Sequence, residues 1–300
     1  MPKKRILVVS QGFFPEPFRI NDMCREWVKR GYEVTVLTGI PNYPQGKFYP
    51  GYGWFHKRKE EWEGVLIHRI PLLPRGHSKI GLIFNYFTFV ISGFFWKLFT
   101  RLRADCVFIF GTSPMTQALP GVWYARRRKL PCYLYVQDLW PDNVEIIAGI
   151  HSKAILKPIE KMVNYIYKRC DLILATSPSF VAQIQERVSG RRERVVYWPQ
   201  YAEEFYQPQP RRAVPEIPDD GSFKIVFTGN IGQAQGLDIL PQTAQKLQSL
   251  LDASQPVRFV IIGDGRYKAQ LLREIDEKNV GELFVLVDRQ PAERIPELLA

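Results

Sequence analysis

Apolar and polar positions alternate along the chain in blocks that predict repeated units of a strand followed by a helix. The apolar blocks that predict strands before residue 200 are 5–10, 32–39, 104–111, 130–138, 171–177 and 194–199. The blocks with helical spacing of apolar residues are 21–31, 118–128, 155–169 and 180–188. Strands that alternate with helices form parallel sheets with helices on their faces. The pattern therefore predicts a doubly wound α/β domain.

The pattern stops in residues 207–222 and then resumes. This stretch is rich in proline and has no periodicity, which is typical of a linker. The blocks that follow it are strands at 223–229, 257–265 and 282–288 and helices at 237–251 and 267–278. We expect an N-terminal domain at 1–206, a linker at 207–222 and a second Rossmann-like domain at 223–300. The second domain has only three predicted strands, so we expect it to be incomplete here; a short domain of its own is the alternative.

The positive charge is concentrated in the N-terminal half of the chain. The formal net charge is +11; residues 1–150 contain 21 Lys and Arg against 11 Asp and Glu, and residues 151–300 contain 20 against 19. A one-sided basic excess favours an anionic partner, such as a phospholipid surface, a phosphorylated lipid or a nucleic acid. A basic surface that serves only solubility is the alternative.

The cysteines and the N-terminus indicate a cytoplasmic protein. Cys24, Cys106, Cys132 and Cys170 occur singly, without the spacing of a metal site or a disulfide framework. The basic N-terminus precedes only a short apolar run, which does not match a signal peptide. We expect no metal and a reducing compartment.

Residues 81–99 form a strongly apolar, aromatic segment. Its uncharged part, residues 81–96, is 16 residues long, shorter than the ~20 residues of a membrane-spanning helix. A helix packed on the sheet would normally have a polar face, which is hard to find here. We favour an interfacial helix over a buried one, because basic residues flank the segment. The residues expected at the membrane are Phe84, Tyr86, Phe87, Phe94, Phe95, Trp96, Lys97 and Arg101.

Two polar positions of the first domain follow predicted strands. Ligands of open parallel sheets gather at the carboxyl ends of the strands. Gly12 lies at such an end, although a simple turn glycine is an equal alternative. Asp138 ends another strand and is a candidate acid, base or hydroxyl ligand; its alternative role is a helix N-cap.

A glycine-rich corner joins a strand and a helix in the second domain. Gly229, Gly232 and Gly236 follow the strand, and there is no Lys or Arg from Phe227 to Leu240. Backbone amides and the positive end of a helix bind anions without a cationic side chain. We therefore expect a diphosphate site there, with neutral side-chain donors.

Six sequence elements together resemble the GT-B glycosyltransferases of family 4. The elements are RGYEVTVLTG (30–39), PNYPQGKFYPGY (41–52), QDLWPD (137–142), WPQYAEEFYQP (198–208), TGNIGQAQGLD (228–238) and IIGDG (261–265). They resemble the branch that builds bacterial O-antigen, capsule and exopolysaccharide, including N-acetylfucosaminyl transferases. The second element is the most specific of them.

The resemblance implies two facing Rossmann-like domains and a retaining transfer without metal or cofactor. The donor is a UDP- or GDP-sugar, and the acceptor is a polyprenyl-diphosphate-linked glycan at the inner membrane, with no role for nucleic acid. The donor-binding residues it implies are Gly12, Gly229, Asn230, Gly232, Gln235, Gly236, Gly263, Asp264, Gly265 and Arg266. The acceptor-binding residues are Asn21, Asn42, Tyr43 and Lys47. The catalytic candidates are Asp138 and Gln137.

The chain departs from the family pattern at three points. Asn230 and Gln235 stand where the family has an Arg and a Lys that hold the diphosphate. Gln137 stands where many members have a His near the 6-hydroxyl of the donor sugar, which suggests a 6-deoxy donor. The family's paired glutamates should lie beyond residue 300, so we expect transfer by the whole gene product and not by these 300 residues alone.

Two other functions fit parts of the pattern. A sugar-nucleotide epimerase shares the two-domain architecture but does not need the aromatic segment. A nucleic-acid or membrane-binding module would use the basic runs at 125–129 and 191–194, which are more often solvated faces.

Overall fold

The computed structural model describes residues 3–188, 190, 192–250 and 256–300, and the chain forms two compact units. The first unit is Met1–Gln200 and the second is Tyr201–Ala300. The expected helix end at residue 251 and the first residue of the basic run 191–194 lie outside the described residues.

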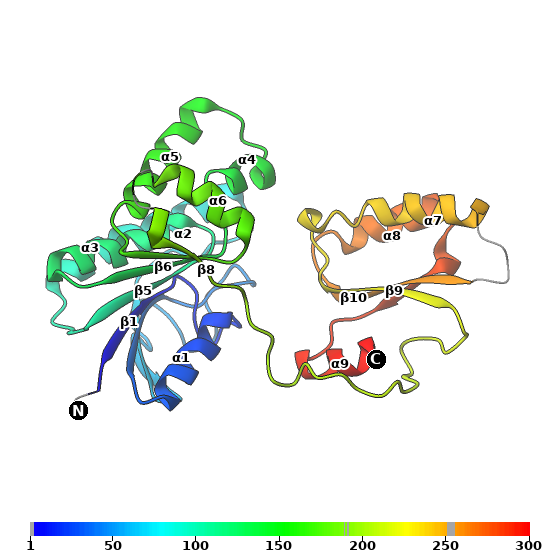
Figure 1. Ribbon diagram of the computed structural model, residues 1–300, viewed down its shortest axis with the longest axis horizontal. Coiled ribbons are helices and arrows are strands. Elements are labelled where there is room, and N and C mark those ends of the chain that lie inside the picture. The colour runs from blue at the N-terminus through cyan, green and yellow to red at the C-terminus, as the bar shows by residue number, and fades with distance from the viewer. Residues whose placement is uncertain (1–2, 189, 191, 251–255) are drawn as a thin grey trace. The chain divides into compact units, whose positions relative to one another are not determined.

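The first unit is built on an eight-stranded sheet (Figure 1). The strands are β1 (Arg5–Val9), β2 (Glu33–Gly39), β3 (Lys59–Trp62), β4 (Val65–Ile70), β5 (Cys106–Gly111), β6 (Cys132–Val136), β7 (Leu172–Ala175) and β8 (Val195–Tyr197). Their order is β3-β4-β2-β1-β5-β6-β7-β8. All neighbours pair in parallel except β3, which is antiparallel to β4.

Helices cover both faces of this sheet. They are α1 (Arg19–Lys29), α2 (Lys79–Phe99), α3 (Ala118–Arg128), α4 (Asp142–Ala148), α5 (Lys153–Tyr167) and α6 (Pro178–Arg187). In Figure 1, α1 lies on one face and α2, α3, α5 and α6 lie on the other. Side chains alternate along β1, so that Leu7 and Val9 join the core under α2 and α3, and Val8 joins the core under α1. Burial on both faces explains why the strands read as continuous apolar runs.

Three elements of this unit were not predicted. The strand β3 is charged, KEEW, because it lies at the edge of the sheet, where half of its positions face solvent. The strand β4 follows it after a tight turn at Gly64, and α4 is a short helix after the cis peptide bond Trp140–Pro141. Short elements of this kind leave little periodicity in a sequence.

The apolar helix α2 buries only a narrow stripe. Asn85, Phe89 and Gly93 are its buried residues, spaced by four along one line of the helix. A Cβ at Gly93 would lie 2.3 Å from the Pro120 ring, so this glycine allows α2 and α3 to touch. The large side chains that are exposed on α2 are Ile80, Ile83, Phe84, Phe87, Ile91, Phe94, Phe95 and Phe99. The alternative of a buried core helix is therefore wrong.

The helix α2 is long and apolar enough to cross a bilayer. Core helices of soluble proteins can have the same length and apolar composition. The helix has 21 residues and so is longer than its 16-residue uncharged run.

The second unit has a three-stranded parallel sheet of order β11-β10-β9. Its elements are β9 (Phe223–Asn230), α7 (Ile239–Leu250), β10 (Val257–Asp264), α8 (Lys268–Glu277), β11 (Phe284–Val287) and α9 (Ile295–Leu299). In Figure 1, α7 and α8 lie on one face of this sheet and α9 lies on the other. Two apolar clusters, one on each face, form its core.

Two glycines bring the ends of β9 and β10 into close contact. Gly229 and Gly263 are register partners with φ of 151° and 147°. A Cβ on Gly263 would lie 1.9 Å from the carbonyl oxygen of Gly229. Only glycine fits both the backbone angle and the space.

We predict that Gly263→Ala destabilises the second unit by about 2–4 kcal/mol, because it adds both steric overlap and backbone strain. All seven tryptophans lie in the first unit, so the measurement is hydrogen exchange of peptides from β9 and β10. Gly281→Ala is the matched control, because nothing lies within 4 Å of a Cβ at that position. Equal protection in the two variants would contradict the prediction.

Candidate functional site

The loops that follow the strands of the first unit meet at the carboxyl edge of its sheet. The strand order reverses between β1 and β5, because the chain builds β2 and β4 on one side of β1 and β6, β7 and β8 on the other. Such a switch point is where open α/β sheets bind ligands. The loops that flank it begin at Ser10 and Thr112.

Four amide side chains, which we call the amide network, join the loops at this edge; three of them are buried and Gln11 is half-buried. They are Gln11, Asn42, Asn85 and Gln117. The Oε1 atom of Gln117 accepts a hydrogen bond from the Gln11 backbone N–H at 2.6 Å. Its Nε2 atom donates to the carbonyl oxygen and the hydroxyl of Thr112, at 2.7 and 2.9 Å. Gln117 therefore ties the loop after β1 to the loop after β5.

Asn85 connects α2 to the same edge. Its Oδ1 atom accepts a hydrogen bond from Gln11 Nε2 at 2.7 Å, and its Nδ2 atom donates to the Leu73 carbonyl at 2.6 Å. A longer contact of 3.4 Å joins Nδ2 to Asn42 Oδ1. The polar residue inside the apolar helix thus holds the helix to the loops after β1, β2 and β4.

One acceptor of the network has no partner. Gln11 Oε1 is buried and makes no hydrogen bond within the described part of the chain. Buried polar atoms are nearly always satisfied, so an unpaired acceptor at a switch point marks a place for a ligand hydroxyl or a water.

A buried carboxylate holds the loop of residues 41–46. Glu16 is 2% exposed, and its Oε1 atom accepts hydrogen bonds from the backbone N–H groups of Asn42 (2.7 Å) and Tyr43 (2.6 Å). Burial raises the pKa of this carboxyl to about 7, although these hydrogen bonds and the charge of Arg69 act in the opposite direction. Neither Glu16 nor Gln11, Asn85 and Gln117 had been identified as site residues from the sequence.

The four expected acceptor residues differ in accessibility. Asn21 and Asn42 are buried, and their Nδ2 atoms donate to the carbonyls of Glu16 and Ile40, both at 2.8 Å. In this structure they support the loop. Tyr43 and Lys47 are exposed at its surface, and Arg75 lies over the Tyr43 ring at 5.0 Å.

Gly12 lies in the loop after β1, where a Cβ would be 2.3 Å from the Phe18 ring. The ring packing of Phe18 therefore requires a glycine there, whether or not the loop also contacts a ligand.

Asp138 is positioned at the end of β6 by the neighbouring loop. Its Oδ2 atom accepts a hydrogen bond from the Ser113 backbone N–H at 2.6 Å. Ser113 Oγ in turn accepts from Trp140 Nε1 at 3.0 Å. Within the described residues Oδ1 has no hydrogen-bond partner, so it is available to a hydroxyl group.

Gln137 precedes Asp138 in the chain, and its side chain makes one hydrogen bond within the first unit. Its Oε1 atom accepts a hydrogen bond from Gln200 Nε2. Its Nε2 atom is buried without a hydrogen-bond partner among the described residues. Gln200 therefore ties the Gln137 side chain to the protein at this edge.

The glycine-rich corner of the second unit has the expected geometry. It runs from the end of β9 through a 3-10 helix (Gln233–Gln235, η3) into α7. Asn230 and Gln235 flank Gly232, because a Cβ there would lie 2.7 Å from Asn230 Nδ2 and 2.8 Å from Gln235 Oε1. Both side chains are exposed, and Gly236 has the left-handed φ of 64°. The two neutral side chains thus converge on Gly232, whose N–H donates to the Asn230 carbonyl at 2.9 Å and whose carbonyl accepts from the Gln235 N–H at 3.1 Å.

The next strand end packs against this corner. A Cβ on Gly265 would lie 2.2 Å from the Ile231 carbonyl oxygen, which accepts a hydrogen bond from Tyr267 N–H at 3.0 Å. Asp264 Oδ1 accepts from the Gly265 N–H at 2.8 Å. The glycine-rich turns of β9 and β10 therefore form one continuous surface of backbone.

Two cationic side chains lie beside this surface. Arg266 is exposed and has no hydrogen-bond or ion-pair partner within the described residues. Lys268, which the sequence had not singled out, begins α8 and pairs with Asp288 at 2.6 Å. That ion pair lowers the pKa of Asp288.

The residues expected at the membrane all lie on α2 or just after it. Tyr86, Trp96 and Lys97 are half-buried, and the four expected Phe residues and Arg101 are exposed. Lys97 lies over the rings of Phe94 and Trp123, at 4.3 and 5.0 Å.

The basic run 125–129 closes the C-terminal end of α2. Arg127 and Arg128 donate hydrogen bonds to the carbonyls of Leu98 and Thr100, at 3.4 and 3.0 Å. These bonds satisfy carbonyls at a helix end, where cations are favourable.

No group of three or more His, Cys, Asp or Glu side chains within the described residues is placed to hold a metal ion. Charged and amide groups, together with backbone amides, are therefore the chemistry that both units present.

The chain belongs to the glycosyl transferase 4-like domain family, which matches residues 18–200. It is 26% identical over 296 residues to an Escherichia coli (strain K12) protein named as the colanic acid biosynthesis glycosyl transferase WcaI, covering 92% of this chain and 70% of that protein. The sucrose-phosphate synthase of Thermosynechococcus elongatus has a similar structure, with a TM-score of 0.69 and 13% identity over 99% of this chain and 73% of that one. Anabaena Alr3699/HepE in complex with UDP and glucose has a TM-score of 0.61 and 11% identity over 99% and 71%.

These relations confirm the expected enzyme class and fold class. The protein is a glycosyltransferase, and its sheets have the Rossmann-like α/β architecture of GT-B enzymes. The epimerase alternative is not favoured. The roles given above to individual site residues stay predictions.

We predict that the stability of the first unit falls as the pH rises from about 5 to 8. The folded state holds the Glu16 proton more tightly than the unfolded chain, with a pKa of about 7 against 4.5. This stability is fully present below pH 4.5 and is lost as the pH passes 7, for a total of about 3 kcal/mol. Urea unfolding, followed by tryptophan fluorescence, measures it.

Glu16→Gln is the matched comparison, because its amide oxygen can still accept the two backbone hydrogen bonds. Burial lowers the pKa of His68, which acts in the opposite direction, so the two proteins are compared at each pH. Parallel pH profiles for the two proteins would refute the role of Glu16.

Proposed function

We propose that this glycosyltransferase moves a sugar, with retention of configuration, from a UDP- or GDP-sugar to a polyprenyl-diphosphate-linked glycan of a bacterial surface polysaccharide. The glycine-rich corner of the second unit is the observation that carries the proposal. Its paired strand ends, the neutral donors Asn230 and Gln235 and the adjacent cation Arg266 form a surface that fits the diphosphate of a nucleotide sugar.

The relatives supply the chemical class of both substrates. Alr3699/HepE was solved with UDP and glucose and also with UDP-glucose, which supports a nucleotide-sugar donor. The name of WcaI refers to colanic acid, a polysaccharide, which supports a glycan product.

The first unit then holds the acceptor at its carboxyl edge. Asp138 Oδ1 accepts the hydrogen bond of the attacking hydroxyl and orients it, with Tyr43 and Lys47 as further contacts. The leaving diphosphate assists in taking up the proton, and the protein contributes orientation and stabilisation of the phosphate charge.

The exposed face of α2 supports an interfacial position at the inner face of the membrane. Its large apolar side chains face solvent, and basic residues lie at both of its ends. Asn85 is tied into the amide network, which favours a helix that stays on the protein surface over one that spans the bilayer. Acceptors anchored by a polyprenyl chain lie at that surface.

The donor preference follows from Gln137. Its Oε1 atom accepts a hydrogen bond from Gln200, which ties the side chain to the protein, and Gln137 stands where many members of the family have a His near the 6-hydroxyl of the donor sugar. This arrangement favours a 6-deoxy sugar such as N-acetylfucosamine. A panel of UDP- and GDP-sugars tests the choice, and a preference for glucose or N-acetylglucosamine over 6-deoxy sugars would remove it.

We predict that Gln235→Ala raises the KM for the nucleotide-sugar donor by about 3- to 10-fold, as expected for one neutral hydrogen bond. Transfer kinetics and titration calorimetry on the whole gene product, with the donor chosen from the panel, measure the effect. Gln248→Ala, at the far end of α7, is the control and should leave KM unchanged. If Gln235→Ala behaves like this control, the diphosphate lies elsewhere; if no nucleotide sugar binds, the proposed function fails.

A further inference from the structure

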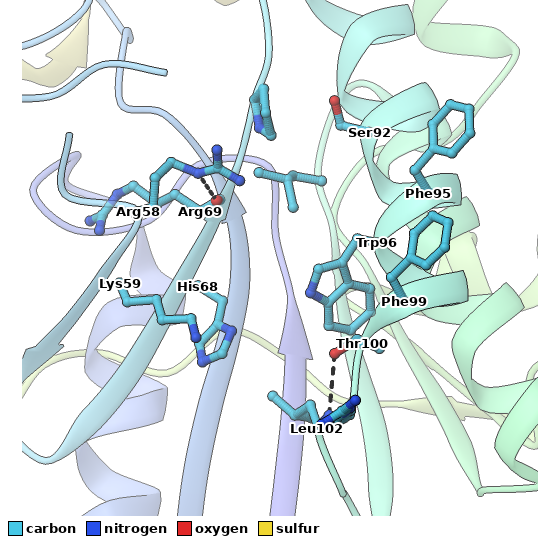
Figure 2. Close-up of a pocket in the computed structure, with 13 residues that line it drawn as sticks. Arg58, Lys59, His68, Arg69, Ser92, Phe95, Trp96, Phe99, Thr100 and Leu102 are labelled. Atoms are coloured by element: carbon cyan, nitrogen blue, oxygen red, sulfur yellow. Dashed lines mark hydrogen bonds between the residues drawn. The ribbon is translucent and has the colours of Figure 1, made fainter. Parts of the chain in front are cut away.

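A groove lies between the edge of the sheet and the C-terminal half of α2 (Figure 2). It has a volume of about 720 Å³ and is lined by β3, β4 and the segment from Ser92 to Leu102. Figure 2 shows the Trp96 indole pointing from the helix toward the strands, with Phe95 and Phe99 further out. The groove has no part in the site described above.

One wall of the groove is cationic. Lys59 and His68 are register partners on neighbouring strands and lie side by side (Figure 2), and Arg101 completes the lining at the end of α2. There is no carboxylate among the described residues that line the groove, and these three side chains form no ion pair there. Glu61 lies two residues beyond Lys59 on the same face of β3, opposite Leu66, outside the lining.

Lys59 and His68 are two basic side chains side by side, and neither has an ion-pair partner among the described residues. Burial of His68, together with the charge of Lys59, lowers the pKa of its imidazole. An anion between the two side chains would pair with Lys59 and would favour the protonated form of His68, in opposition to this shift.

The other wall is apolar and open to the surroundings. Phe95 is 54% exposed and Phe99 is 78% exposed, and both continue the exposed apolar face of α2. A cationic wall opposite an aromatic wall matches a molecule with an anionic head and an apolar tail.

We propose that this groove binds the phosphate headgroup of an anionic membrane phospholipid, with the acyl chains along Phe95 and Phe99. The phosphate lies between Lys59, His68 and Arg101. The site is separate from the acceptor site: Trp96 lies about 16 Å along α2 from Asn85, at 1.5 Å per residue. The proposal adds a specific lipid contact to the interfacial position of α2, and it does not depend on which sugar is transferred.

A resident phospholipid fits the groove better than the acceptor does. The groove opens beside the exposed face of α2, where bilayer lipids are abundant, and it is remote from Asp138, where the acceptor hydroxyl must react. Its lining has five basic side chains and two hydroxyl side chains, Ser92 and Thr100. Arg58 and Arg69 hydrogen-bond backbone carbonyls, and Arg69 also pairs with Glu60, which leaves Lys59, His68 and Arg101 for a ligand. These groups suit a single phosphate with a short polar head.

The test compares two double variants that each remove two positive charges. Lys59→Gln with Arg101→Gln removes two groove charges that form no ion pair, and Lys4→Gln with Lys29→Gln removes two exposed lysines outside the groove, one before β1 and one at the end of α1. Flotation measures binding to vesicles of phosphatidylcholine alone and of phosphatidylcholine with phosphatidylglycerol in equal parts.

We expect the groove variant to lose at least about tenfold in binding to the phosphatidylglycerol vesicles and to keep its binding to phosphatidylcholine, whereas the control variant changes little. Equal losses in the two variants would show a diffuse attraction and overturn the site. Binding to neutral vesicles that contain polyprenyl phosphate is measured as well. If only this binding depends on Lys59 and Arg101, the groove belongs to the acceptor and the proposal fails. Full competition by inorganic phosphate would equally rule out a lipid site.

A second measurement uses the native side chains. Phosphatidylglycerol with brominated acyl chains should quench the fluorescence of Trp96, and Trp96→Phe should remove that part of the quenching. Quenching that is unchanged in Trp96→Phe would contradict the proposal. Neither readout requires sugar transfer, so failure of the lipid site and failure of the proposed function are distinguishable.

Discussion

The hydrogen bond between Gln11 and Asn85 is the contact on which the arrangement of the first unit depends. It joins the loop after the central strand β1 to the apolar helix α2, and Gln117 and Asn42 extend the connection to the loops after β5 and β2. Leaving one of these buried amides without a partner costs about 1–3 kcal/mol. The four side chains therefore fix the relative positions of loops that are separated by up to 106 residues in sequence.

Most strands and helices could be predicted from the apolar pattern of the sequence. Many of the polar contacts at the carboxyl edge of the sheet could not. Strands such as β1 and β5 are almost wholly apolar because both faces of the sheet are covered, and that signal is local. The edge strand β3 escapes detection because one face is solvated and the strand is short. The glycine-rich corner could be predicted from the sequence because each strand end needs a glycine for its own backbone conformation. Gly229 and Gly263 both have a positive φ.

The amide network and Glu16 could not be derived from the sequence. Asn85 reads as a polar interruption of an apolar helix, and only the packing of α2 shows that it faces Gln11. Glu16 reads as a loop carboxylate on the surface, yet it is buried because the loop of residues 41–46 folds over it and supplies two N–H donors. When the hydrogen-bond partner of a side chain comes from a distant segment, the local sequence pattern does not indicate the contact.

The amide network consists of neutral groups, and this bears on our proposal that the enzyme works at a charged membrane surface. Near anionic lipids the proton and salt concentrations differ from those of the bulk solution, and exposed ion pairs change strength accordingly. Buried amide hydrogen bonds have no proton to gain or lose and no net charge for salt to screen. The link between α2 and the loop after β1 therefore has the same strength whether the helix lies in water or against the membrane.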